Sequence, residues 1–139
     1  MRYPADLTAP MAAELENSGF TSLKTVEEVD GVLREQSGTT LLMVNSVCGC
    51  AAAAARPGVI DSLGHEAKPD QVVTVFAGVD MEATKRAREY LLPYPPSSPC
   101  VALFKDGQLV HMIERHHIEG RPGVLISANL KAAYDEFCK

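Results

Sequence analysis

The sequence has no excess of positive charge. Its 13 Lys and Arg residues are outnumbered by 18 Asp and Glu residues, which gives a net charge of −5 over 139 residues. A protein that binds nucleic acid needs a basic surface to hold phosphates, and an anionic membrane repels an acidic protein. We therefore expect no nucleic acid and no membrane among the partners.

A long apolar segment is also missing. The longest mostly apolar run, Leu41 to Ala55, contains Asn45 and Ser46 and is too short and too polar to cross a bilayer. The first residues carry Asp6 and no apolar core, so we expect no signal peptide. The expected location is cytoplasmic. In that reducing environment, paired cysteines are more often catalytic or metal-binding than structural.

Several patterns that mark other classes of protein are absent as well. The sequence shows no internal repeat, linker, glycine-rich phosphate loop, nucleophile elbow or paired-carboxylate hydrolase pattern. Its composition, with 46% hydrophobic and 22% charged residues, is ordinary for a globular protein. A chain of this length buries enough surface for one core. We therefore expect a single domain over residues 1–139.

Helical and strand-like segments alternate along the chain. Helices are predicted at residues 9–18, from a capping box of Thr25 and Glu28 to Gly38, from about 49 onward with a kink at Pro57, at 81–92 and at 124–137. Strands are predicted at residues 20–23, 39–44, 71–77, 100–104 and 108–113, the last two joined by an Asp-Gly turn. This order predicts an α/β fold, in which helices flank both faces of a central mixed β-sheet and one extra helix lies at the N-terminus.

Two of only four cysteines stand one residue apart, in the segment Ser46-Val47-Cys48-Gly49-Cys50. A strand before them and a helix after them place Cys48 at a helix N-terminus, where unpaired N–H groups and the helix dipole stabilise a thiolate. Gly49 permits the tight backbone that two nearly adjacent sulfurs need. A disulfide across this spacing closes a very small ring, and strained disulfides are the labile ones. We therefore predict that Cys48 is the attacking thiolate, against the alternative of two buried, inert thiols.

A proline-rich segment precedes one of the predicted strands. Residues 93–99 hold four prolines, and cis peptide bonds occur almost only before proline. We predict a cis bond between Ser98 and Pro99, because Pro99 abuts the strand that starts at Cys100 and because the chain also carries the Cys-Gly-Cys segment. The alternative is an ordinary trans, proline-rich loop. In redox domains of this topology, such a loop faces the thiol helix and offers backbone groups to the bound partner.

Four segments, VNSVCGCAAAAARPG, PYPPSSP, ALFKDGQLVH and RHHIEGRPG, together resemble the bacilliredoxin family, in matching order over most of the chain. The resemblance implies a thioredoxin-like fold. It also implies an enzyme, a thiol–disulfide oxidoreductase that removes bacillithiol from protein mixed disulfides. By position, Cys48 would be the nucleophile, Cys50 the possible resolving thiol and Pro99 the cis-proline.

The resemblance also sets expectations for ligands and partners. We expect Gly49, Ser98 and Pro99 to bind the substrate. Bacillithiol would be a co-substrate, and we expect no tightly bound cofactor. The expected partners are S-thiolated client proteins, the low-molecular-weight thiol and a recycling reductase.

Two other functions stay open. A dithiol disulfide isomerase or oxidase would need the Cys48–Cys50 pair in every turnover. A metal-binding or redox-sensing adaptor would have no turnover. We expect no metal, because structural zinc sites space paired cysteines by two to four residues. In addition, His116 and His117 would face opposite ways on an extended backbone.

The remaining candidate residues are two cysteines and three arginines. Cys100 directly follows the predicted cis-proline and is interpreted as a buried, inert thiol, with a role as a third participating sulfur as the alternative. Cys138, beside the C-terminus, fits the late cysteine of the family. Arg56, Arg115 and Arg121 could bind the carboxylates of a small thiol, because the arginine fork matches a carboxylate.

Overall fold

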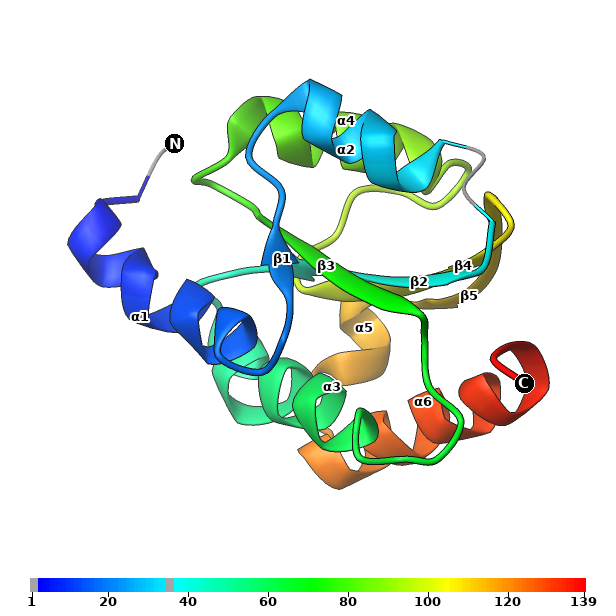
Figure 1. Ribbon diagram of the computed structural model, residues 1–139. Coiled ribbons are helices and arrows are strands. Elements are labelled where there is room, and N and C mark those ends of the chain that lie inside the picture. The colour runs from blue at the N-terminus through cyan, green and yellow to red at the C-terminus, as the bar shows by residue number, and fades with distance from the viewer. Residues whose placement is uncertain (1–2, 35–36) are drawn as a thin grey trace.

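The computed structural model describes residues 3–34 and 37–139 (Figure 1). The helices are α1 (Ala5–Glu16), α2 (Val26–Leu33), the π-helical η1 (Ala51–Ala55), α3 (Arg56–Ser62), α4 (Met81–Tyr90), α5 (Arg115–Ile118) and α6 (Gly123–Phe137). The strands are β1 (Thr21–Ser22), β2 (Thr39–Asn45), β3 (Gln71–Phe76), β4 (Cys100–Lys105) and β5 (Gln108–Ile113). Within the described ranges, no helix combines the length and the apolar composition that a membrane crossing needs.

The five strands form one mixed sheet in the order β1-β3-β2-β4-β5. Strands β1, β3 and β2 run parallel, whereas β4 is antiparallel to β2 and β5 is antiparallel to β4. Every residue of β2 is buried, as expected for a central strand that is covered on both faces. The β4–β5 hairpin turns at Asp106 and Gly107, whose φ values of 50° and 80° suit a tight two-residue turn.

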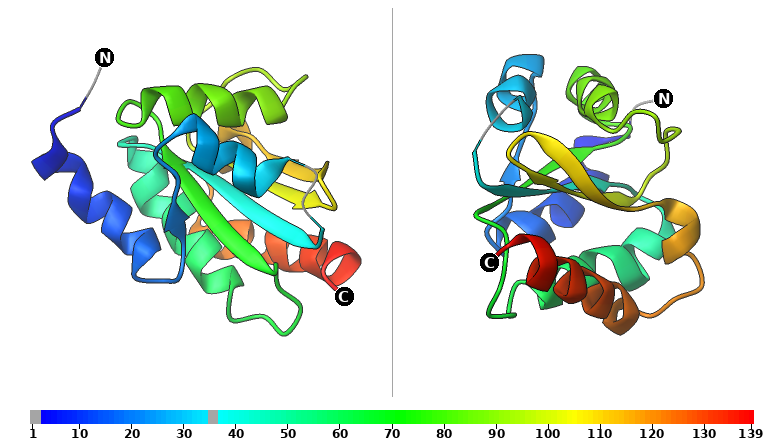
Figure 2. Two further views of the ribbon diagram at one scale, coloured as in Figure 1. Left: turned by 45° about the horizontal axis from the view of Figure 1, so that its top comes forward. Right: turned by 90° about the vertical axis from the view of Figure 1, so that its right-hand side faces the viewer.

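Helices cover both faces of this sheet (Figures 1 and 2). Helices α2 and α4 lie side by side on one face, and α3 and α6 lie on the other. Alternation along β2 explains the two layers: Leu41 and Met43 belong to the core cluster on the α3 and α6 side, whereas Leu42 and Val44 belong to the cluster on the α2 and α4 side. Helix α1 packs beside α3 and β1. The predicted mixed sheet, with helices on both faces and an extra N-terminal helix, is confirmed.

The largest differences from the predicted helix boundaries are at the start of α1 and at the end of α2. Helix α1 begins at Ala5, four residues early, and contains Pro10. The capping box of Thr25 and Glu28 is present at the start of α2. The predicted end of α2 at Gly38 is wrong, because the helix ends at Leu33 and the next residue already has an extended backbone (φ −80°, ψ 108°). Residues 35 and 36 of the predicted helix lie outside the described residues.

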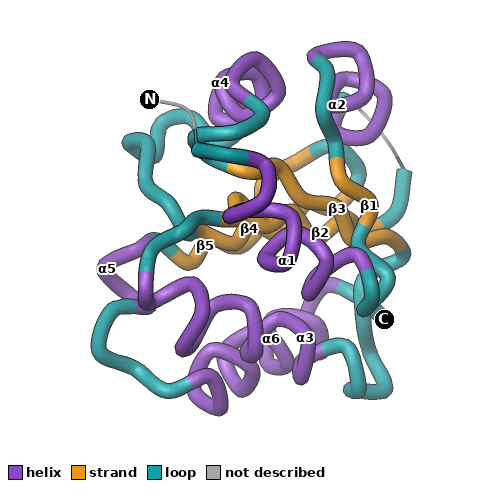
Figure 3. Tube along the Cα trace, turned by 90° about the vertical axis from the view of Figure 1, so that its left-hand side faces the viewer, coloured by secondary structure: helices purple, strands orange, loops and turns teal. Residues whose placement is uncertain are grey.

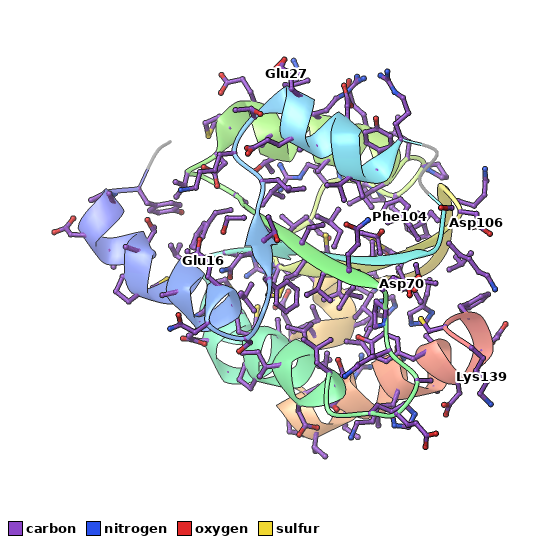
Figure 4. All side chains as sticks on the ribbon, viewed as in Figure 1. Glu16, Glu27, Asp70, Phe104, Asp106 and Lys139 are labelled. Carbon is purple, nitrogen blue, oxygen red and sulfur yellow. The ribbon has the colours of Figure 1, made fainter. Side chains whose placement is uncertain are left out.

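Carboxylates anchor the start of β2, at the end of the strand far from the cysteines. The N–H of Gly38 donates to Asp106 Oδ1 at 2.8 Å, and the N–H of Thr39 donates to Asp70 Oδ2 at 2.9 Å. Figure 4 shows Asp70 and Asp106 at this end of the sheet. Gly38 has a φ of 88°, which is why a glycine occupies the position. Its role is to start β2 rather than to end α2.

The helix behind β2 contains a π-helical turn and approaches α6 closely. The N–H of Arg56 donates to the carbonyl of Ala51, five residues back, and Pro57, which has no N–H to donate, follows directly. The kink predicted at Pro57 therefore takes the form of a π-bulge just before it. At the next residue, a Cβ on Gly58 would lie 2.7 Å from Cβ of Ile126, so only glycine allows this packing of α3 against α6.

Candidate active site

Cys48 lies in the turn between β2 and the helix formed by η1 and α3. The strand ends at Asn45, and the first helical residue is Gly49. The Cys48 carbonyl accepts hydrogen bonds from the N–H groups of Ala51 and Ala52, at 3.0 and 3.4 Å. Cys48 therefore lies immediately before the helix, where the first N–H groups favour a negative charge. The structure thus places Cys48 where the sequence pattern predicted it.

A buried polar network holds this turn in place. The guanidinium of Arg56, only 2% exposed, donates from Nη1 to Asn45 Oδ1 and to the Ser46 carbonyl, both at 3.0 Å. Its Nε donates to Glu14 Oε2 of α1 at 3.1 Å. The hydroxyl of Ser46 in turn accepts the N–H of Cys48 at 3.0 Å. The expectation that Arg56 binds a substrate carboxylate is wrong, because the side chain is buried and its Nε and Nη1 donate to groups of the protein.

The two sulfurs of the motif face each other. Cys48 Sγ and Cys50 Sγ lie 2.9 Å apart as free thiols joined by a hydrogen bond. The pKa of Cys48 is lowered, chiefly by the hydrogen bond from the Cys50 side chain, with help from the backbone N–H groups of Cys50 and Ala51 and from the charge of Arg115. The pKa of Cys50 is raised, chiefly by burial and next by its bond to Cys48. The pair therefore favours a thiolate at Cys48 and a thiol at Cys50.

The proline-rich loop reaches the same end of the sheet. The bonds Leu92–Pro93 and Ser98–Pro99 are both cis. Cys100, the residue after this loop, pairs with Val44 near the end of β2, so the buried Pro99 lies close to the turn that carries Cys48. The arrangement brings the residues of the predicted substrate site, Gly49, Ser98 and Pro99, to one end of the sheet.

Arg115 connects this loop with the thiol pair. It is the first residue of α5, a short helix below β5 on the side of the sheet that α3 and α6 cover (Figure 3). Its Nη1 donates to the Ser98 carbonyl at 3.2 Å, and its Nε donates to Glu119 Oε1 at 3.0 Å. Its charge acts on the sulfurs of both Cys48 and Cys50. Of the three arginines that the sequence suggested, Arg115 is therefore the one placed at the thiol site.

The other two cysteines occupy different surroundings. Cys100 is 1% exposed and packs in the cluster on the α2 and α4 side, whereas Cys50 packs against the cluster on the opposite face. Burial raises the pKa of Cys100 to about 12. Cys138 caps the end of α6, and burial raises its pKa as well. Both thiols are poor nucleophiles near neutral pH, which favours the interpretation of Cys100 as inert.

One group of side chains in the described part of the chain could hold a metal ion. The ligand atoms of Glu114, His116 and His117 lie within 4.8 Å of one another. The assumption that the two histidines stand on extended backbone is wrong, because both belong to α5 and their ring centroids are 4.0 Å apart. However, His117 Nδ1 already accepts the Glu114 N–H, and the Glu114 carbonyl accepts the His117 N–H at 2.9 Å. These contacts explain the group as a helix cap.

The polar residues around Cys48 were not found from the sequence. In the sequence, Asn45 and Ser46 only interrupt an apolar run, and Glu14 and Glu119 belong to no motif. The signal was present in the first two, because a polar pair at the end of a fully buried strand needs partners for its side chains. Glu14 had no such signal, since α1 meets Arg56 only through the tertiary fold.

Comparisons with known proteins show the family of this chain. A family model described as "Disulphide isomerase" matches residues 3–138. A bacilliredoxin from Cytophaga hutchinsonii is 59% identical over 134 residues, which cover 96% of this chain and 98% of that protein. The chain belongs to the bacilliredoxin family. Another bacilliredoxin, from Halalkalibacterium halodurans, is 50% identical over 137 residues, which cover 99% of this chain and 95% of that protein.

Solved structures show the fold. Mitochondrial thioredoxin 3 from Saccharomyces cerevisiae aligns with a TM-score of 0.57 at 17% identity, covering 85% of this chain and 95% of that one. Thioredoxin O2 from Arabidopsis thaliana aligns with a TM-score of 0.57 at 18% identity, and the alignment covers 88% of this chain and 97% of that one. The predicted thioredoxin-like fold is confirmed. The fold and the bacilliredoxin family together identify a thiol–disulfide oxidoreductase.

Proposed function

We propose that this chain removes a low-molecular-weight thiol of the bacillithiol type from mixed disulfides on client proteins, with Cys48 as the nucleophile. The observation that carries the proposal is the sulfur pair: 2.9 Å separate Cys48 Sγ from Cys50 Sγ at the start of a helix. The surroundings lower the pKa of Cys48 and raise that of Cys50. Disulfide exchange requires a thiolate as the attacking group, and a neighbouring thiol can then resolve the mixed disulfide.

In the first step, the Cys48 thiolate attacks the small-thiol sulfur of the mixed disulfide. A bond forms between Cys48 and the small thiol, the bond to the client sulfur breaks, and the client leaves as a thiolate that takes a proton from water. This exchange is redox-neutral, because one disulfide replaces another. Gly49 suits the approach of the substrate, since a Cβ at this exposed residue would meet no heavy atom within 4 Å.

In the second step, a second thiol releases the small thiol from Cys48. Cys50 can attack Cys48 after losing its proton, which frees the small thiol and leaves a Cys48–Cys50 disulfide. A recycling reductase then returns two electrons and two protons to that disulfide. Alternatively, a second molecule of the small thiol attacks the small-thiol sulfur that is bound to Cys48. This step leaves a disulfide of two small thiols and a free Cys48 thiolate. The short distance between the two sulfurs favours the route through Cys50.

The experiment uses a client protein that carries one bacillithiol mixed disulfide, with release of the client thiol as the readout. We expect the Cys48→Ser chain to release none. We expect the Cys50→Ser chain to release the client and to retain the small thiol on Cys48, visible as an added mass. The Cys138→Ser chain is the matched control and should behave like the parent. Full release by the Cys48→Ser chain contradicts the proposal.

A second candidate is a dithiol disulfide isomerase that cycles through the Cys48–Cys50 pair. The close approach of the two sulfurs favours it, and so does the description of the matching family model. This function needs Cys50 in every turnover. A Cys50→Ser chain that keeps full activity toward a protein disulfide would exclude it, whereas loss of that activity with retained release of the small thiol would show that the chain performs both reactions.

A further inference from the structure

Arg115 has contacts that a solvated surface arginine would not need. Its backbone N–H donates to Ser97 Oγ at 3.5 Å, and its side chain donates to the Ser98 carbonyl and to Glu119. The side chain is 43% exposed, so these bonds hold a partly open group in one orientation. The guanidinium thus joins α5 to the loop that ends at the cis-proline.

We propose that Arg115 is a positioning residue of the exchange reaction, whose guanidinium fixes the Ser98 carbonyl and holds a positive charge beside the Cys48–Cys50 sulfur pair. The inference rests on the proposed role of Cys48 as the nucleophile, but not on the identity of the small thiol. It assigns to α5 a function in the reaction that the helix cap at Glu114 does not explain.

The charged and polar groups around the sulfurs support this assignment. From its own helix, Cys48 faces the N–H groups of Cys50 and Ala51, together with the Cys50 thiol. From α5, it faces the charge of Arg115, while the charge of Glu119 acts on Cys50 in the opposite sense. The interaction is mutual, because the charge of Cys48 is the largest cause that raises the pKa of Arg115.

The other two candidate arginines are placed differently. Arg56 is buried and its donors bind Asn45, Ser46 and Glu14. Arg121 is exposed and donates to the His117 carbonyl at the far end of α5. Arg121 is therefore a matched control, since its substitution removes the same charge from the same region without removing a contact to the cis-proline loop.

The fork of Arg115 also explains why arginine suits this position better than lysine. The side-chain bonds to Glu119 and to Ser98 use two of the five N–H donors of a guanidinium, in fixed directions. A lysine would keep the positive charge but would lose the planar fork that holds Ser98 and Glu119 together. Charge and orientation can therefore be separated by substitution.

The test compares the parent with Arg115→Met, Arg115→Lys and Arg121→Met chains. The readout is the rate at which iodoacetamide, a neutral reagent, alkylates Cys48 as a function of pH, with the site identified by peptide mass spectrometry. Because nearby opposite charge stabilises a thiolate but partial exposure screens it, we expect Arg115→Met to react about two- to fivefold more slowly than the parent at pH values below the parent's midpoint. At high pH, where Cys48 is ionised in every chain, the rates should converge.

The two control substitutions complete the design. Arg115→Lys should recover most of the parent's alkylation rate. Its KM for the mixed disulfide should be higher than the parent's, because lysine lacks the planar fork that orients the loop. Arg121→Met should follow the parent's profile. Protection of the buried Cys100 from alkylation shows that each chain is folded.

An Arg115→Met profile identical to that of the parent, or an equal shift in the Arg121→Met chain, overturns the inference. Such a result leaves the proposed function standing as long as the Cys48→Ser chain releases no client. Release by the Cys48→Ser chain would instead defeat the proposed function, whatever the alkylation profiles show.

Discussion

Replacing Arg56 with methionine is expected to destabilise the protein and loosen the turn that carries Cys48. The guanidinium is 2% exposed and makes two hydrogen bonds of 3.0 Å, to Asn45 and Ser46, and a third to the half-exposed Glu14. A hydrogen bond to a charged group contributes about 1.5–3 kcal/mol, and the bond to Glu14 contributes less because solvent screens it. Arg56→Met removes the donor from Asn45 Oδ1 and from the Ser46 carbonyl, and methionine refills part of the space, so we expect the free energy of unfolding to fall by about 3–5 kcal/mol.

The assay is urea unfolding followed by circular dichroism, combined with alkylation of Cys48 in the native state. The Arg34→Met chain is the control, because the side chain of Arg34 is 61% exposed and pairs with Asp30 on the surface of α2. That change should cost less than about 1 kcal/mol. If the Arg56→Met chain loses less than about 1 kcal/mol and alkylates Cys48 as the parent does, the reasoning about the buried network is refuted.

Three further predictions concern packing, capping and pH. Gly58→Ala should lower the free energy of unfolding by about 1–3 kcal/mol, because a Cβ there lies 2.7 Å from Cβ of Ile126 and 2.9 Å from the Gly123 carbonyl. Gly31→Ala, in open space on α2, should instead be neutral or stabilise by up to about 1 kcal/mol; calorimetry of both chains tests the pair, and equal effects would contradict it. Thr25→Ala should cost about 1 kcal/mol, because it removes the cap that accepts the Glu28 N–H at 3.1 Å; an unchanged melting temperature would count against the capping box. Cys100, with a pKa raised to about 12 by burial, should resist alkylation in the native protein up to mildly alkaline pH and react once the chain is unfolded; rapid native labelling would show that it is accessible.

Much of the fold could be predicted from local patterns. The β-branched, apolar run at β2, the Asp106-Gly107 turn and the capping box at Thr25 each have a specific geometric cause, and all three are present. The end of α2 could not be read in the same way. A glycine with positive φ can either end a helix or precede a strand. Gly38 precedes β2, where its N–H bonds to Asp106, a residue 68 positions away in the sequence.

The site was predictable where it depends on neighbours in the chain. The position of Cys48 follows from a strand and a helix that flank it, and the cis bond lies before Pro99 as the pattern indicated. The roles of the arginines could not be predicted, because they depend on which element each side chain meets. Arg56 turns into the core toward Asn45, whereas Arg115 meets the proline loop only because α5 folds back beneath β5.

Its surroundings make Cys48 the more acidic thiol of the pair. The pH dependence of alkylation at Cys48 and at Cys50 within the same reduced molecule, resolved by mass spectrometry, tests this difference. We expect Cys48 to react first, with a midpoint below that of an ordinary thiol, while Cys50 stays unmodified until higher pH. Earlier reaction of Cys50, or a Cys48 midpoint at or above the ordinary thiol value, would contradict it.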